Sequence, residues 1–277
     1  MIPVFLFLAI AYMRGWLRVR ARSAQAVGPW CATGFLLGLV LIWMARASPM
    51  ASDEAHSLTV HMAQHLMLMS LAPALIWMAE PVRMLMFGLP SPLAELVVLP
   101  IARWRPIQRL GQLLGHPLVC WLAATTALVA WHVPILFMLS MHSTGWRAIA
   151  HASFLSGGLL FWWPVVRPWP SSSIERPWST VLYLFLATLP CDVLSGLLVF
   201  SERIAYPIYL TAPGHLSVSL LDDQQRAGAL MWTAVTIIYG VAGVIVATRC
   251  LSRISLRVDE RPALRVGCGL RARLEPR

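Results

Sequence analysis

The 277-residue chain is 58% hydrophobic and only 12% charged, which is about half the charged fraction of a typical soluble domain. Its 22 basic residues are all arginine and, against 12 acidic residues, give a formal net charge of +10. Because the arginines lie between and after long apolar blocks, where topology signals occur, their pattern argues against nucleic-acid binding. The composition predicts an all-α, polytopic membrane protein.

Seven apolar blocks approach the roughly 20 residues that a helix needs to cross a bilayer. In chain order the predicted spans are Ile2–Leu17, Pro29–Ala47, Ser57–Ala79, Pro117–Ser140, Ala148–Val166, Trp178–Phe200 and Ala227–Thr248. The proline-rich, amphipathic segment 80–116 predicts one or two helices on the membrane surface, between the third and fourth spans. We expect a seven-span domain over residues 1–250 and a basic, poorly ordered cytoplasmic tail over residues 251–277.

The arginines also predict the orientation of the bundle. If the N-terminus is outside, the inner segments hold 18 of the 22 arginines. The outer segments then hold only Arg46, Arg147, Arg203 and Arg226. Because inner loops of membrane proteins are enriched in basic residues, we predict an outer N-terminus and a cytoplasmic C-terminus.

Ionisable side chains interrupt several of these apolar blocks. His61 and His65 lie one turn apart, on one face of the third predicted span. In the predicted topology His65, His132 and Asp192 each lie eight residues, or about 12 Å, from the outer end of their span. His151 lies at the outer start of the fifth span. Ionisable groups inside a membrane usually have a function, so we expect these side chains to converge near the outer face.

The residue types in this layer fit metal binding. Imidazole and carboxylate, with a thioether from Met69 or a thiolate from Cys191, are suitable ligands for copper or another late transition metal. A purely structural alternative stays open, because polar side chains in bundles also hydrogen-bond across helices. Met69 then fills a gap and Cys191 is a small buried side chain.

Two functional alternatives also stay open. Histidines on facing helices, such as His65 and His132, could bind haem iron axially. A transporter or proton path would need polar residues that continue to the inner face. The inner halves of the predicted spans are apolar, which argues against such a path.

Several short motifs resemble the seven-span CtaG-type cytochrome c oxidase assembly factors of bacteria. The matching stretches are His61-Met-Ala-Gln-His65-Leu with Ala72-Pro73; His116-Pro117-Leu118-Val119; Trp131-His132-Val-Pro134; His151-Ala-Ser-Phe-Leu155; Gly158-Leu-Leu-Phe161-Trp162-Trp163-Pro164; Leu189-Pro190; Asp222-Asp223-Gln224-Gln225-Arg226-Ala227-Gly228; and Met231-Trp232. Together they extend from the first predicted span through the seventh.

The resemblance implies an integral protein of the bacterial inner (plasma) membrane that helps to make active haem–copper oxidase. It implies copper as the cargo, oxidase subunits as partners and a periplasmic copper chaperone as a possible donor. The sequence shows no nucleophile–base constellation and no phosphate-binding glycine loop, so we predict no enzymatic turnover. A metal-free scaffold for oxidase subunits is the alternative.

By position, the resemblance assigns four histidines and one carboxylate to the metal site: His61, His65, His132, His151 and Asp223. Asp192 is expected beside them, as a ligand or as a partner that holds a histidine tautomer. The stretch around Asp192, residues 190–195, departs from the family pattern. The assignment of Asp192 therefore rests on its depth alone.

Overall fold

The computed structural model describes residues 2–23, 25, 27–47, 56–93, 95–96, 100, 104–166, 177–210 and 219–271. All regular secondary structure in these ranges is helical. This follows from the apolar composition, because a helix satisfies its own backbone hydrogen bonds inside a membrane. The prediction of an all-α polytopic membrane protein is confirmed.

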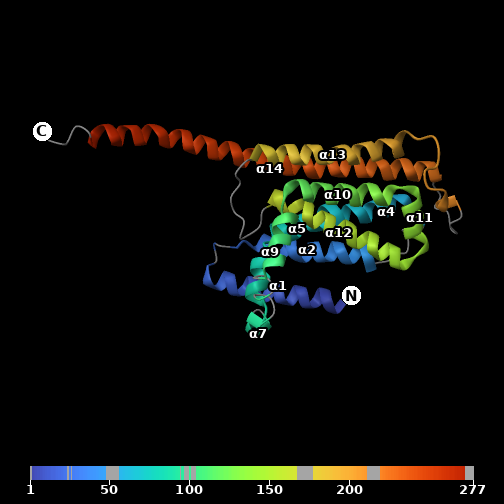
Figure 1. Cartoon of the computed structure of the whole chain (residues 1–277), viewed down its shortest axis with the longest axis horizontal. Coiled ribbons are helices and arrows are strands. Elements are labelled where there is room, and N and C mark those ends of the chain that lie inside the picture. The colour runs from blue at the N-terminus through green and yellow to red at the C-terminus, as the bar shows by residue number, and fades with distance from the viewer. Residues whose placement is uncertain are drawn as a thin grey trace.

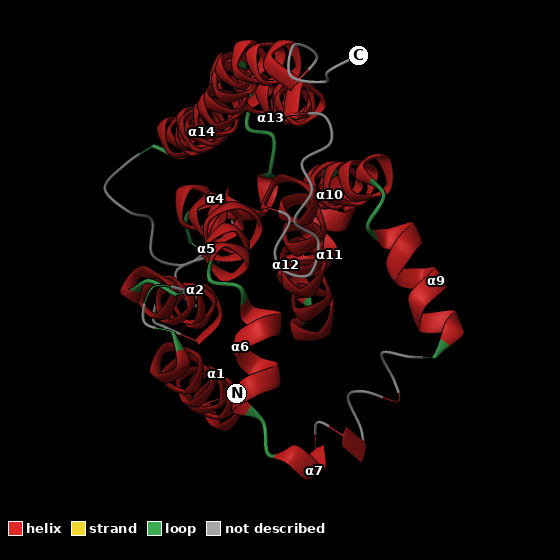
Figure 2. Ribbon diagram, turned by 90° about the vertical axis from the view of Figure 1, so that its left-hand side faces the viewer, coloured by secondary structure: helices red, strands yellow, loops and turns green. Residues whose placement is uncertain are grey.

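The long helices run side by side along the long axis of the molecule (Figure 1) and are seen nearly end-on in Figure 2. They are α1 (Ile2–Arg22), α2 (Pro29–Ala47), the continuous segment α4–η1–α5 (Leu58–Leu66, Met67–Leu71 and Ala72–Met78), α10 (Pro117–His132), α12 (Thr144–Val166), α13 (Pro177–Phe200) and α14 (Leu220–Arg271). A short α11 (Pro134–His142) and the 3-10 turn η3 (Pro207–Leu210) complete one end of the bundle.

Six of these helical segments, all except α10, are long and apolar enough to cross a membrane. A seventh crossing is reached only if α9 (Arg105–Leu114) and α10, which meet at an angle of 72°, are counted as one broken span. The structure therefore supports six of the seven predicted spans, and α10 is the segment that does not qualify by itself. We name the two ends of the bundle the α11 end, where α1 begins, and the α9 end, where α10 begins (Figure 1).

The prediction that Pro117–Ser140 forms one continuous span is wrong. The helix ends at His132, and Val133 adopts an extended conformation with φ −64° and ψ 126°. The cause is Pro134, which disfavours a helical conformation at the preceding residue and has no N–H to donate. His132 therefore stands at the end of α10 and not in its middle.

The segment between the third and fourth spans forms α6 (Pro81–Gly88), α7 (Ser91–Leu93) and α9. α9 is amphipathic and buries none of its residues, and it lies across the bundle axis (Figure 2), as predicted for a surface helix. α6 instead packs closely on α1. A Cβ at Gly88 would overlap the carbonyl of Ala11, and one at Gly15 would overlap the carbonyl of Met84. Glycine at both positions permits this approach.

The C-terminal segment also differs from expectation. α14 is a 52-residue helix that continues to Arg271, in a region where the sequence predicted a poorly ordered tail. It leaves the bundle at the α9 end (Figure 1). Residues 272–277 of the predicted tail lie outside the described residues.

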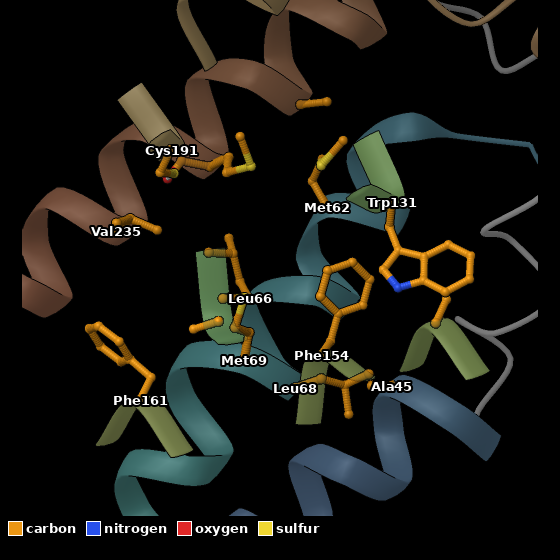
Figure 3. Packing of buried hydrophobic residues seen from close by; sticks show 14 of the residues in the cluster. Ala45, Met62, Leu66, Leu68, Met69, Trp131, Phe154, Phe161, Cys191 and Val235 are labelled. Carbon is orange, nitrogen blue, oxygen red and sulfur yellow. Dashed lines mark hydrogen bonds between the residues drawn. The ribbon is translucent and has the colours of Figure 1, made fainter. Parts of the chain in front are cut away.

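The main core lies between α4–η1–α5, α10, α12, α13 and α14. Its side chains include Met62, Leu68 and Phe154, which are fully buried (Figure 3). Toward the α9 end Phe161 stacks on Tyr183 and Tyr239, with ring centroids 5.0 Å apart in both pairs. This packing holds α12, whose other half carries His151, against α13 and α14.

Candidate metal-binding site

The first two histidines project from the start of α4. Ser57 caps this helix by accepting a hydrogen bond from the backbone N–H of Val60, at 3.4 Å. His61 and His65 follow on the buried face, each 4% exposed. Their ring centroids are 3.9 Å apart, in an edge-to-face arrangement. The predicted i, i+4 pair is thus confirmed as one buried unit.

His132 meets this pair from α10. Its ring centroid is 5.6 Å from that of His65, and the side chain is 5% exposed. Its Nδ1 lies 2.7 Å from the carbonyl oxygen of Leu128. Because a carbonyl only accepts, Nδ1 carries the proton of a neutral ring, and Nε2 keeps the lone pair that could bind a metal.

His151 completes the group from α12 and is also 4% exposed. It interacts electrostatically with His65, as do His61 and His132. We call His61, His65, His132 and His151 the histidine cluster. The structure therefore brings together the four histidines that the sequence predicted.

Two aromatic rings wall this cluster. Phe137 of α11 lies 4.9 Å from His61, centroid to centroid, and Phe154 of α12 lies 3.9 Å from His65. Both phenylalanines are fully buried. The imidazoles consequently lie in an apolar setting, where a polar atom without a partner is costly.

Several imidazole nitrogens in the cluster make no hydrogen bond within the described part of the chain. They include both ring nitrogens of His65 and Nε2 of His132. Within the described part of the chain, no group of three or more His, Cys, Asp or Glu side chains is placed to hold a metal ion. His65 and His132 thus have ring nitrogens available to a ligand, but the four histidines do not form a complete coordination shell.

The helix changes its winding directly after His65. Residues Met67–Leu71 form a turn of π-helix, and Pro73 follows at the start of α5. Such π turns occur frequently at functional sites. Gly158 of α12 packs on this turn, because a Cβ there would overlap the Met69 carbonyl and come within 2.8 Å of Pro73 Cγ.

Asp192 lies next to the histidine cluster without joining it. It lines the same groove as His132 and Tyr206. Its buried Oδ1 has no hydrogen-bond partner in the described chain, so the predicted tautomer-holding contact to a histidine is not formed. The preceding residue, Cys191, faces the interior.

Asp223 holds two helices together. Its carboxylate accepts hydrogen bonds from the backbone N–H of Leu58 (2.7 Å) and from the hydroxyls of Ser57 (2.9 Å) and Thr59 (2.6 Å). These bonds fasten the first turn of α14 to the first turn of α4, one turn before His61. Its contacts therefore explain Asp223 as a cap for α4, a role that the sequence did not predict.

Sequence reasoning also missed Tyr206. Its hydroxyl donates to the carbonyl oxygen of His132 at 3.0 Å, and its ring stacks on Phe137 with centroids 4.0 Å apart. The break at Val133 frees this carbonyl from its helical partner. The Trp-His-x-Pro motif signals that a carbonyl becomes available, but nothing in the sequence identifies Tyr206 as its donor.

A family model described as cytochrome c oxidase caa3 assembly factor (Caa3_CtaG) matches residues 10–253. An uncharacterized protein of Mycobacterium leprae is 25% identical over 270 residues, which cover 93% of this chain and 39% of the relative. An uncharacterized protein of Mycobacterium bovis is 25% identical over 239 residues, covering 82% of this chain and 34% of the relative. The chain thus spans less than two fifths of these curated relatives. No solved structure matches it.

Proposed function

Because the chain belongs to the cytochrome c oxidase caa3 assembly factor family, we propose that it assists oxidase assembly by binding copper and passing it to the enzyme. The observation that supports this proposal is the histidine cluster, in which buried imidazoles from α4, α10 and α12 come together. Both ring nitrogens of His65 and Nε2 of His132 make no hydrogen bond within the described residues. Neutral imidazole binds copper well. The buried nitrogens of His65 and His132 that lack a hydrogen bond are best explained by a bound ligand.

The incomplete shell fits a cargo site. An assembly factor must release its ion, and ligand exchange is easier from a site with few fixed ligands than from a closed one. His132 is held in the tautomer that presents Nε2, while His65 can approach from α4. Copper would enter between these rings and leave by exchange onto a ligand of the oxidase, with no catalytic turnover by this chain.

We place the α11 end at the outer face of a bacterial inner membrane, with the C-terminus in the cytoplasm. The arginine distribution supports this orientation. The histidine cluster then opens toward the periplasm, where oxidase subunits could accept copper and a periplasmic copper chaperone could supply it.

Haem binding is less well supported. The rings of His65 and His132 meet edge to face, with centroids 5.6 Å apart. A porphyrin therefore does not fit between them in this arrangement. Phe137 packs against His61 and Phe154 packs against His65, so the sides of the cluster are also filled. A small ion needs far less space than a porphyrin.

The test compares His61→Ala/His65→Ala with His142→Ala, a control in the exposed end of α11. Cells carrying each form in place of the natural gene are assayed for oxidase activity and for copper in the purified oxidase. We expect both to fall at least about tenfold in the double variant and to stay unchanged in the control. A fully active, copper-replete oxidase in the double variant would contradict copper delivery and favour the alternative function, a metal-free scaffold for oxidase subunits.

A further inference from the structure

A small cavity lies directly below the histidine cluster, toward the α9 end. Its volume is about 30 Å³, enough for one water or one ion. Four of the side chains that line it carry metal-binding atoms: His65, Met69, Cys191 and Met231. All four are buried, with exposures of 4%, 8%, 3% and 2%. In Figure 3 Cys191 lies on one side of this interior and Met69 on the other.

We propose that this cavity binds a single Cu(I) ion through the imidazole of His65, the thioethers of Met69 and Met231, and the thiolate of Cys191. The proposal rests on the proposed function, because it gives the copper cargo a second, sulfur-rich position beneath the histidine cluster. Soft thioether and thiolate ligands select Cu(I) over harder ions.

Cys191 is not the only side chain that points to a bound ion. His65 is buried, lines the cavity, and has no hydrogen bond at either ring nitrogen within the described chain. One nitrogen can face the cavity while the ring keeps its edge contact with His61 and His132. His65 is therefore the residue that both positions share, and a ring rotation would move the ion between them.

The thiol of Cys191 is only weakly engaged. Its Sγ lies 3.8 Å from Ser195 Oγ and 3.9 Å from the carbonyl oxygen of Met231. Both distances are long contacts that a metal–sulfur bond would replace at little cost. The π turn at Met67–Leu71 adds to the case, because it sets the direction of Met69.

Charge balance favours Cu(I) in this apolar place. The empty cavity carries a neutral thiol and a neutral imidazole. Binding Cu⁺ to the thiolate releases one proton to solvent, so the net charge of the cavity stays zero. A divalent ion would leave one uncompensated positive charge in the bilayer interior, which is costly.

The test loads the purified full chain with Cu(I) under anaerobic conditions and records copper X-ray absorption spectra. We expect both sulfur and nitrogen ligands in the wild type. Cys191→Ser and Met231→Leu, which preserve size, should each lower Cu(I) affinity at least tenfold. The triple variant that adds Met69→Leu should lose the sulfur signal. Cys31→Ser is the control, since Cys31 is a buried thiol packed in a separate cluster with α1 and α2.

The possible failures are distinguishable. Bound copper with nitrogen ligands only, or a spectrum unchanged in Cys191→Ser, overturns the cavity site and leaves the histidine cluster standing. No bound copper in a folded wild type overturns the proposed function as well. In His132→Asn, sulfur-coordinated copper should persist, and its loss would contradict a separate position. Thermal unfolding of every variant confirms that a lost signal is not a lost fold.

Discussion

His132 and His142 make the same backbone contact in different surroundings. In each, Nδ1 lies 2.7 Å from the carbonyl oxygen of the residue four positions earlier. His132 is buried against His65, whereas His142 is exposed at the end of α11. The backbone contact sets the tautomer in both residues, but only at His132 does the second nitrogen point into a group of imidazoles.

This pair provides a matched substitution. His132→Asn keeps an amide donor near Leu128 and deletes the ring nitrogen that could bind metal. We expect the nitrogen-coordinated copper of the histidine cluster to bind at least about tenfold more weakly, while sulfur-coordinated copper persists and thermal stability changes little. Equilibrium competition with a Cu(I) chelator and thermal unfolding in detergent measure the two quantities.

His142→Asn is the control for that substitution and should leave both quantities unchanged. Equal copper affinity in His132→Asn and wild type would show that His132 is not a ligand. Its burial would then serve packing alone.

Asp223 should matter for stability and not for copper. Asp223→Ala removes three hydrogen bonds to the start of α4, and we expect unfolding free energy to fall by about 2–3 kcal/mol. Copper bound per folded molecule should not change. Asp222→Ala, at an exposed neighbouring position, is the control, and its thermal midpoint should match wild type. A loss of copper affinity in Asp223→Ala without a loss of stability would restore Asp223 as a ligand.

Gly158 should be intolerant of even a methyl group. A Cβ at this position would approach the Met69 Cα to 2.8 Å and overlap its carbonyl, so α12 and the π turn must separate. We expect Gly158→Ala to cost about 1–3 kcal/mol and to weaken copper binding, because Met69 and His65 lie on the displaced segment.

The neighbouring Gly157→Ala is the comparison. Its Cβ would meet Ala124 Cα at 3.4 Å and Ala127 Cβ at 3.5 Å, which is ordinary contact. Thermal unfolding should therefore separate the two variants clearly. Equal stability would mean that α12 moves away from the π turn without cost.

Much of the bundle was predictable because membrane helices follow directly from apolar length. The ends of the third span, predicted as Ser57 and Ala79, fall within one residue of Leu58–Met78. The prediction of the fourth span as Pro117–Ser140 was wrong at one position, Val133. Hydropathy does not register that Pro134 forbids a helical Val133, so the length of the apolar block overstated the length of the helix.

The histidine cluster was predicted correctly, but partly for a wrong reason. His61 and His65 follow from helical spacing alone. The depth of His132 was counted along a continuous helix to Ser140, which does not exist. In the structure His132 is the last residue of α10 and lies beside His65. The partners of Asp223 and Tyr206 depend on contacts across 74 to 166 residues of sequence, which no local pattern encodes.

Tyr206 offers a test that depends on pH. Burial raises the pKa of Tyr206 to about 12, above its ordinary value near 10. The protonated hydroxyl is the form that donates to His132, so its contribution to stability is fully present below pH 10. Above pH 10 the unfolded chain ionises first, and stability falls by about 1.4 kcal/mol per pH unit until the folded group also ionises near pH 12.

Tyr206→Phe should therefore cost less stability at high pH than at pH 8. At pH 8 the variant loses the hydrogen bond and leaves the His132 carbonyl without its donor, a cost of about 1–3 kcal/mol. Between pH 10 and 12 the variant lacks the ionising group, so its deficit relative to wild type should shrink with every increase in pH. Unfolding measured in detergent at pH 8, 10 and 11 follows this difference. A deficit that stays constant across the series would show that the Tyr206 hydroxyl ionises as readily in the folded chain as in the unfolded one.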